Sequence, residues 1–252
     1  MHGAGNDFVM IDDRDGKTPT DRAFLAALAA PRTGVACEGV ILVQRSATDD
    51  FRMRFFNPDG GEAEMCGNGA RCVAAFAREI GAAKGAKMTF ETLAGRVAAE
   101  VLDGATVKIR LPDPKDLRDD FVNSGVPHKI VPVADVATVD VAGEGRRIRY
   151  SGEFAPAGTN VDFVAYSAPH DAAMRTYERG VEAESGACGT GAVAAAVVGV
   201  AQHAMAFPVR VRTAGGFTLE IDGARRPDGT FTDVTLTGPV ARVFDGVMEV
   251  AE

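Results

Sequence analysis

The chain has 252 residues, of which 46% are hydrophobic and 25% charged, the composition of an ordinary globular protein. Its net charge of −8 argues against nucleic acid or an anionic membrane as a partner, because both require a basic face. The longest apolar run, residues 187–201, is too short and too rich in glycine and alanine to span a bilayer. No cationic segment followed by an apolar core begins the chain, so we also expect no signal peptide.

The cysteine pattern argues against a disulfide framework and against structural zinc. Four cysteines occur in a chain of this length, without a Cys-x2-Cys pair: Cys37, Cys66, Cys72 and Cys188. We therefore expect reduced thiols in a cytosolic protein and no bound metal.

The first half of the chain predicts a mixture of strands and two helices. A glycine-rich opening leads into a strand at 8–11, and a helix at 21–30 is stopped by Pro31, with Phe24, Leu25 and Leu28 facing inward. A buried strand follows at 40–43, and an alternating strand at 51–55 ends in the turn Asn57–Gly61. After Cys66 the apolar positions follow helical spacing up to Gly81, which suits a C-cap.

The rest of the chain predicts hairpins, a linker and a second helix. We expect a hairpin at 88–101, a strand at 107–111, a charged linker at 113–120, a strand at 158–164 that echoes the opening, an enclosed helix at 193–200, a hairpin at 209–221, and closing strands at 234–237 and 240–244. The last two are separated at Gly238-Pro239, because proline lacks the N–H that a strand ladder needs.

One sequence pattern occurs twice. Glu64–Ala75 contains Cys-Gly-Asn-Gly-Ala before an alanine-rich run, and Gly186–Ala196 contains Cys-Gly-Thr-Gly-Ala before another. Cys66 and Cys188 stand 122 positions apart, close to half the chain, and the hairpins that follow keep nearly the same offset. Two copies at this spacing predict a duplicated lobe.

Each copy has the features of a proton-transfer site. A cysteine at a helix N-terminus lies in the positive end of the helix dipole, which lowers its pKa, and the following backbone N–H groups can bind a carboxylate. Two symmetric lobes would face each other across a cleft, so that one thiolate removes a proton from a carbon and the opposite thiol returns one to the other face. Cys37 and Cys72 lack a following Gly-x-Gly and are expected to be structural.

These motifs together resemble the diaminopimelate epimerase family, the two-cysteine amino-acid racemases that work without pyridoxal phosphate. The matching segments, in the family order, are His2–Phe8, Phe56–Gly60, Cys66–Cys72, Gly158–Asn160, Tyr177–Gly180 and Cys188–Gly191. The resemblance implies an α/β (α+β) fold of two pseudo-symmetric lobes, each a curled, mostly antiparallel sheet around a central helix. The lobes are expected at 1–114, with 240–252 returning to it, and at 115–239, with the active site in the cleft between them.

The resemblance also implies roles for particular residues. Cys66 and Cys188 would be the acid–base pair, supported by His128 and Glu178. The reacting α-carboxylate would be held by Gly67, Asn68, Gly189 and Thr190. The distal end of the substrate would be bound by Asn6, Asn57, Asn160 and Arg179, where Arg179 suits a bidentate carboxylate contact and Glu178 also lines the site.

The implied activity is the interconversion of LL- and meso-2,6-diaminopimelate in the synthesis of lysine and peptidoglycan precursors. It would need no cofactor, and the family favours a cytoplasmic homodimer. Val126 stands where the family usually has asparagine, which keeps open a racemase or epimerase of another amino acid, such as histidine or a hydroxyproline. A non-catalytic binding protein is disfavoured because both thiols are present, and a thiol–disulfide oxidoreductase because Cys-x-x-Cys is missing.

Overall fold

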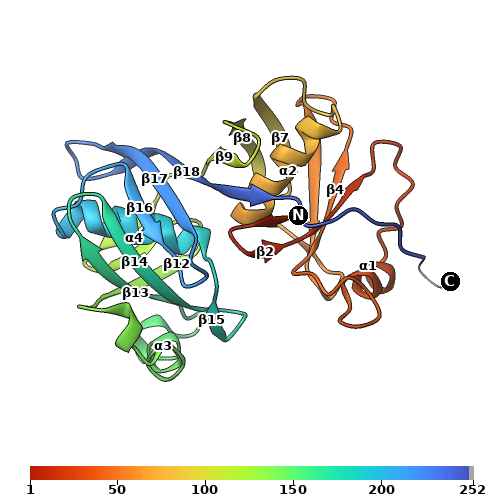
Figure 1. The fold of residues 1–252 in the computed structure, drawn as a ribbon. Helices are drawn as coiled ribbons and strands as arrows, with labels where there is room; N and C mark the ends of the chain where they lie inside the picture. The colour runs from red at the N-terminus through yellow and green to blue at the C-terminus, as the bar shows by residue number, and fades with distance from the viewer. Residues whose placement is uncertain (250–252) are drawn as a thin grey trace. The chain divides into compact units, whose positions relative to one another are not determined.

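The same succession of strands and helices occurs twice along the chain (Figure 1). The computed structural model describes residues 1–249 and divides the chain into two units. The N-terminal unit comprises Met1–Ile109 and the chain from Gly238 onward, and the C-terminal unit comprises Arg110–Thr237. Each unit is a mixed α/β structure in which a sheet surrounds one central helix.

The N-terminal unit has α2 as its central helix. Its elements are β1 (His2–Gly3), β2 (Asn6–Asp7), β3 (Val9–Asp12), α1 (Arg22–Ala29), β4 (Val40–Gln44), β5 (Phe51–Phe56), β6 (Glu62–Ala63), α2 (Gly67–Glu79), β7 (Lys87–Thr92), β8 (Gly95–Val101) and β9 (Thr106–Arg110). β3 pairs in parallel with β4, and β4 pairs antiparallel with β5. β5 pairs antiparallel with β6 and in parallel with β7, and β7, β8 and β9 form an antiparallel meander.

The C-terminal unit has α4 as its central helix. Its elements are β10 (Lys115–Arg118), β11 (Phe121–Asn123), β12 (Pro127–Pro132), α3 (Val141–Arg149), β13 (Asn160–Ser167), β14 (Asp171–Glu178), β15 (Ala183–Ser185), α4 (Gly189–Gln202), β16 (Val209–Arg212), β17 (Thr218–Arg225) and β18 (Phe231–Ala241), with short 3-10 turns at Val136–Thr138 and Gly152–Phe154. β12 pairs in parallel with β13, β13 antiparallel with β14, and β14 in parallel with β16, so the pairing order of the first unit is repeated.

The strand register fixes which residues of the two units are equivalent. Val9 pairs with Val40 in the first unit, and Lys129 pairs with Val161 in the second. This equivalence corrects one expectation from the sequence. The segment at 158–164 corresponds to the strand that begins at Val40 and not to the opening of the chain. The opening corresponds instead to residues 125–128, and Gly5 and Gly125 both have positive φ, 88° and 117°.

The two central helices are enclosed because their sequences are small and apolar. Nearly all of α2 from Asn68 to Ala77 is buried, and α4 is buried from Gly191 to Gly199. α4 contacts β11, β12, β13, β14, β16 and β17, which confirms the prediction of an enclosed second helix. Gly81, with φ of +69°, follows the end of α2 as predicted.

The peripheral helices cover the outer faces of the sheets. Asp21 caps α1 by accepting a hydrogen bond from the Phe24 N–H. Leu25 and Leu28 pack in a cluster with Val40, Leu42 and Phe56, and Phe24 packs against this cluster while remaining half-buried, so all three face inward as predicted. α3 packs on β13 and β14 through a second cluster formed by Val141, Val161, Phe163 and Tyr177. None of the helices within residues 1–249 is long and apolar enough to cross a membrane.

A predicted linker and a predicted break between two strands both prove to lie within strands. The charged segment at 113–120 contains β10, which pairs with β11 and carries a register shift at Asp116, where φ is +56°. The Arg118 guanidinium lies 4.7 Å above the Phe121 ring, so this charged sequence suits an edge strand better than a linker. Likewise, β18 continues through Gly238-Pro239 and ends at Ala241. Proline is tolerated there because its carbonyl makes the contact, accepting from the Ala4 N–H.

Gly145 gives a test of the α3 interface. A Cβ atom at this position would lie 2.4 Å from Cβ of Tyr177, so Gly145→Ala must displace α3 or the strand below it. Although alanine favours a helix by about 1 kcal/mol, we expect a net destabilisation of about 1–3 kcal/mol in urea unfolding. Gly152→Ala is the control, because no atom lies within 4 Å of its added Cβ, and it should change stability by less than about 0.5 kcal/mol. Equal stability of the two variants would contradict close packing of α3.

Candidate active site

Cys188 is the N-cap of the central helix α4. Its Sγ accepts a hydrogen bond from the Gly191 N–H at 3.4 Å and lies 3.5 Å from Oγ1 of Thr190. A Cβ on Gly191 would lie 2.5 Å from Oδ1 of Asp162, so the second glycine of the motif is needed for close packing of the helix on β13. The first glycine, Gly189, begins the helix, where backbone N–H groups have no partner within the helix and are available to an anion.

The electrostatic environment of Cys188 favours the thiol. Burial raises the pKa of Cys188 well above its ordinary value, and the negative charges of Glu178 and Asp162 raise it further. The hydrogen bonds from Thr190 and the Gly191 N–H act in the opposite direction but are outweighed. The expected lowering of the pKa by the helix N-terminus is therefore wrong for this cysteine, because desolvation is the larger effect.

A buried polar network lies beneath the N-terminus of α4. His128 contacts Oδ2 of Asp162 through Nδ1 at 2.7 Å and Oγ1 of Thr190 through Nε2 at 2.9 Å. Thr176 donates to Oδ1 of Asp162 at 2.7 Å. Strand register brings these groups together, because Asp162 pairs with Thr176 across β13 and β14, and His128 pairs with Asn160, two residues before Asp162. The network links His128 to Thr190 and so to the cysteine.

Asp162 was missed by the sequence analysis, although a signal was present. It is a charged residue inside the apolar strand Val161–Val164, and its side chain is fully buried. A carboxylate at such a position requires a specific partner, which here is His128.

Asn160 and Arg179 are brought together at the adjacent edge of the same unit. Oδ1 of Asn160 accepts from the Arg179 N–H at 2.8 Å, and its Nδ2 donates to the Pro127 carbonyl at 3.0 Å. The Arg179 guanidinium is half-buried and contacts the Ala157 carbonyl at 3.5 Å. Glu178 is the last residue of β14, next to Arg179. The Asn160 amide thus holds the backbone of the loop that carries Arg179.

Cys66 is the N-cap of the central helix α2 in the N-terminal unit. Its Sγ donates to Oδ1 of Asn6 at 3.7 Å, and the same oxygen accepts from Nδ2 of Asn68 at 3.4 Å. The structure therefore brings Asn6, Cys66 and Asn68 together, with Gly67 as the first helical residue between them. A Cβ on the second glycine, Gly69, would lie 2.8 Å from Cδ1 of Ile41, which repeats the packing constraint seen at Gly191.

Asn57 lies outside this group. It is exposed in the turn after β5, where its backbone bonds to Gly60 and Gly61. Within residues 1–249 its side chain shares no hydrogen bond with Asn6, Cys66 or Asn68. Its predicted role in substrate binding stays a prediction.

The other two cysteines have the surroundings of structural residues. Cys37 is buried and its thiol donates to the Gly39 carbonyl at 3.2 Å, and burial raises its pKa. Cys72 is fully buried on the inner face of α2, and burial raises the pKa of Cys72 to about 12. All four cysteines are free, and no group of histidine, cysteine or acidic side chains within residues 1–249 could hold a metal ion.

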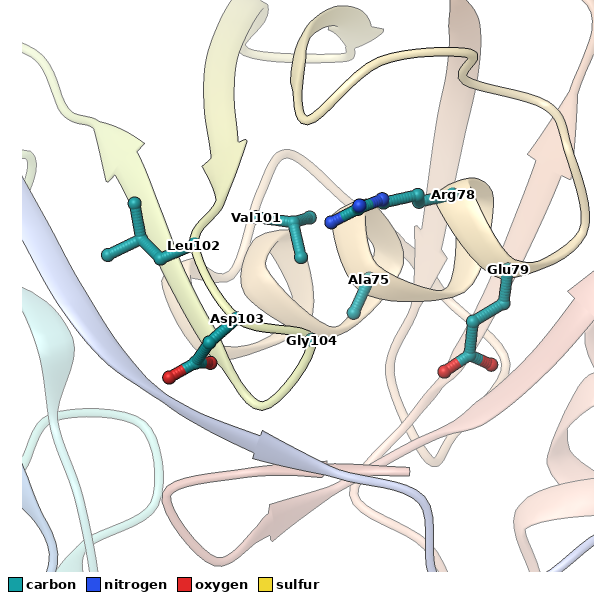
Figure 2. A pocket seen from close by; sticks show the side chains of 7 residues that line it. All are labelled: Ala75, Arg78, Glu79, Val101, Leu102, Asp103 and Gly104. Carbon is teal, nitrogen blue, oxygen red and sulfur yellow. The ribbon is translucent and has the colours of Figure 1, made fainter.

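Two pockets of the N-terminal unit contain none of the predicted site residues. One, of about 480 Å³, lies at the C-terminal end of α2 and is lined by Ala75, Arg78, Glu79 and the turn at 101–104 (Figure 2). The other, of about 500 Å³, is lined by residues of β3 and α1 and by the C-terminal segment from Arg242 to Met248. The candidate chemistry is therefore located by the two cysteine motifs and not by these pockets.

Solved structures with the same fold support the two-lobed α+β architecture. A phenazine biosynthesis protein of the PhzF family from Bacillus anthracis superposes with a TM-score of 0.69 at 18% identity, covering 94% of this chain and 91% of that one. A hydroxyproline epimerase from Agrobacterium vitis superposes with a TM-score of 0.61 at 18% identity, covering 94% and 87%. At this level of identity the likeness shows the fold alone.

Sequence relatives are much more similar. The diaminopimelate epimerase of Aquifex aeolicus is 44% identical over 270 residues, covering 98% of this chain and 95% of the relative. That of Chlorobaculum tepidum is 39% identical and covers 98% and 99%. The family model for diaminopimelate epimerase matches residues 1–114 and 121–241. The chain, with a cysteine capping the central helix of each of its two units, belongs to the diaminopimelate epimerase family.

Proposed function

We propose that the protein interconverts LL- and meso-2,6-diaminopimelate by two-base proton transfer between Cys66 and Cys188. Membership of the diaminopimelate epimerase family supports the reaction. The observation that carries the two-base mechanism is the repeated N-cap cysteine, one at the start of the central helix of each topologically equivalent unit. The product would be a precursor of lysine and peptidoglycan.

The chemistry follows from the two helix N-termini. One cysteine, as thiolate, takes the proton from the α-carbon, and the electron pair of the C–H bond moves into the α-carboxylate, which becomes enolate-like. Backbone N–H groups at Gly67, Asn68, Gly189 and Thr190 hold this carboxylate and stabilise its growing charge. The other cysteine, as thiol, delivers a proton to the opposite face of the carbon, which inverts the stereocentre and requires no cofactor.

The C-terminal unit suits the role of proton donor in this scheme. Cys188 is held as a thiol by burial and by the charges of Glu178 and Asp162. When it has given up its proton, the Gly191 N–H and the Thr190 hydroxyl are in place to stabilise the thiolate. His128 bridges Thr190 and Asp162 and thereby holds the Thr190 hydroxyl in place beside Cys188.

The distal end of the substrate would be recognised by Arg179, Asn160, Asn6 and Asn57. Arg179 offers a guanidinium for the second carboxylate, and Asn160 holds its loop in place. Val126 is the specific observation that favours a second candidate. It occupies the position equivalent to Asn6, so one amide is replaced by an apolar side chain. This change would suit the racemisation or epimerisation of another amino acid, such as histidine or a hydroxyproline.

We propose further that the protein works as a cytoplasmic homodimer. Free thiols support a reducing compartment. For the dimer, the support is a set of exposed apolar side chains on the C-terminal segment, Val243, Phe244 and Val247, which also help to line the pocket of about 500 Å³. Sedimentation analysis should give a dimer for the native chain and a folded monomer for Phe244→Asp. A native chain that sediments as a monomer at micromolar concentration would exclude the dimer.

The first functional test is solvent exchange with purified protein and no added cofactor. In D2O, LL-diaminopimelate should gain deuterium at one α-carbon and yield the meso isomer. Cys66→Ser and Cys188→Ser should each lower kcat by about 10²–10⁴-fold, because serine is a far weaker acid and base. The control is Cys37→Ser, whose hydroxyl can keep the bond to the Gly39 carbonyl and should leave kcat unchanged. Exchange with histidine or hydroxyproline alone would favour the second candidate, and exchange with no amino acid would reject both.

The charge of Asp162 gives a prediction on pH dependence. Because this carboxylate raises the pKa of Cys188, Asp162→Asn should move the alkylation of Cys188 by iodoacetamide to lower pH, measured in a Cys66→Ser background. The same change should lower kcat, since His128 loses its charged partner. Asp171→Asn is the control, because this exposed carboxylate at the start of β14 pairs with Arg210. An unchanged Cys188 profile in Asp162→Asn would show that its charge does not reach the thiol.

A further inference from the structure

The two helix N-termini share one backbone plan but rest on different side chains. Register places Phe8 where the second unit has His128, Ile41 where it has Asp162, and Phe55 where it has Thr176. The support beneath α2 is therefore apolar, with the rings of Phe8 and Phe55 in edge contact. On the helices themselves, the shared Cys-Gly-x-Gly motif places Arg71 of α2 where α4 has Val193. The N-terminal unit thus carries a cation where the other unit has an apolar side chain.

Arg71 is a buried cation without a carboxylate partner. Its exposed fraction is 0%, and within residues 1–249 it forms no ion pair with an acidic side chain. Nη1 donates to the Gly67 carbonyl at 3.2 Å, Nη2 donates to Oδ1 of Asn68 at 2.7 Å, and Nε has no hydrogen-bond partner there. Such a group is costly to bury, because a guanidinium loses its hydration and gains no opposite charge.

The positive charge of Arg71 acts on the two nearby cysteines, Cys66 and Cys72. Burial lowers the pKa of Arg71 to about 10, while negative charge on Cys72 or Cys66 would act to raise it. The attraction between guanidinium and thiolate is mutual, so Arg71 favours negative charge at these sulfurs. Burial keeps Cys72 protonated, with its pKa raised to about 12, and the Met1 ammonium also acts on that thiol. Cys66 is less buried than Cys72, so it is the thiol whose deprotonation the Arg71 charge can favour.

Hydrogen bonds connect the same two residues. Arg71 donates to Oδ1 of Asn68, which fixes the amide so that Nδ2 is directed to Oδ1 of Asn6. That oxygen in turn accepts from Sγ of Cys66. If Asn68 were turned over, its NH2 group would face the guanidinium, where two donors would meet without an acceptor. Arg71 therefore determines which way the Asn68 amide points.

We propose that Arg71 is a positioning residue of the N-terminal motif: it orients Asn68 toward Asn6 and Cys66, and it supplies a fixed buried positive charge that favours the Cys66 thiolate. The catalytic consequence rests on the proposed epimerase function, but the effect on the thiol does not. In the C-terminal unit the charges near the cysteine, on the buried Asp162 and the half-buried Glu178, are acidic and have the opposite effect on Cys188. The two thiols are then unequal before any substrate binds.

The test measures Cys66 itself, in the full chain with Cys188→Ser and without substrate. Alkylation by iodoacetamide is followed across pH 6–10, with mass spectrometry to confirm the modified residue. Arg71→Met keeps the volume and removes the charge, so the midpoint should move to higher pH by about one unit and the rate at pH 7 should fall about tenfold. Arg71→Lys keeps the positive charge but lacks the planar guanidinium group, and it should recover much of the Cys66 alkylation rate.

A second readout separates positioning from a merely structural role. Replacing a buried unpaired cation by an apolar side chain of similar size should leave the Tm of Arg71→Met unchanged or higher, whereas a structural arginine would lower it. The control is Arg14→Met, which removes a guanidinium that pairs with Asp12 and contacts the Ile80 carbonyl at the other end of α2. It should not move the Cys66 profile.

The outcomes are distinguishable. A Cys66 profile in Arg71→Met that superposes on that of the parent would overturn the proposal, as would a shift equal to that of Arg14→Met. If Arg71→Met does not fold, Arg71→Gln, which keeps an amide donor without the charge, decides by the same profile. A shifted profile in a protein that is inactive on diaminopimelate would retain the role of Arg71 and reject only the proposed function.

Discussion

The close approach in each unit between the start of the central helix and the strand beneath it is the constraint on which the rest depends. A single added methyl group at Gly69 or Gly191 would come within 2.8 Å of Ile41 or 2.5 Å of Asp162. Because the helix is held this close, its N-cap cysteine and its first N–H groups have fixed positions relative to the sheet. In the sequence, the second glycine of each Cys-Gly-x-Gly motif suggests a substrate-binding loop. In the structure, its first role is to allow close packing of the helix on the sheet.

Local patterns predicted most of the scaffold because their causes are local. Alternation at Phe51–Phe55 and helical spacing after Cys66 reflect which side faces a neighbouring layer, and both were confirmed. The enclosed second helix followed from a run that is apolar on every face. The paired motifs predicted the two-lobed fold, since a repeated sequence with a constant offset implies a repeated unit. β10 was missed because its charged sequence lacks the apolar alternation of a half-buried strand, and the two closing strands proved to be one because β18 continues through Gly238-Pro239.

The sequence proposed residues for the candidate site but did not reveal their electrostatics. The motifs located both cysteines, yet the direction of the Cys188 pKa depends on burial and on Glu178 and Asp162, which no local pattern reveals. Asp162 and Arg71 are charged residues inside apolar segments, and only the fold shows that Asp162 has a histidine partner and that Arg71 has no carboxylate partner in the described part of the chain. Sequence similarity alone also matched the segment at 158–164 to the opening of the chain. The strand register shows that this segment is equivalent to the strand that begins at Val40.

The two units share one backbone plan but differ in the side chains beneath their central helices. The backbone plan was kept in both units, because changing the glycines or the strand order would separate the helix from its sheet. The side chains beneath the helices were free to differ, and they differ in charge: Phe8, Ile41 and Phe55 on one side, and His128, Asp162 and Thr176 on the other. A two-base reaction requires one group to begin with its proton and the other without it. On the role proposed for Arg71, the charges near the two cysteines favour the thiolate at Cys66 and the thiol at Cys188 in the free protein, and the reverse reaction begins from the opposite protonation states.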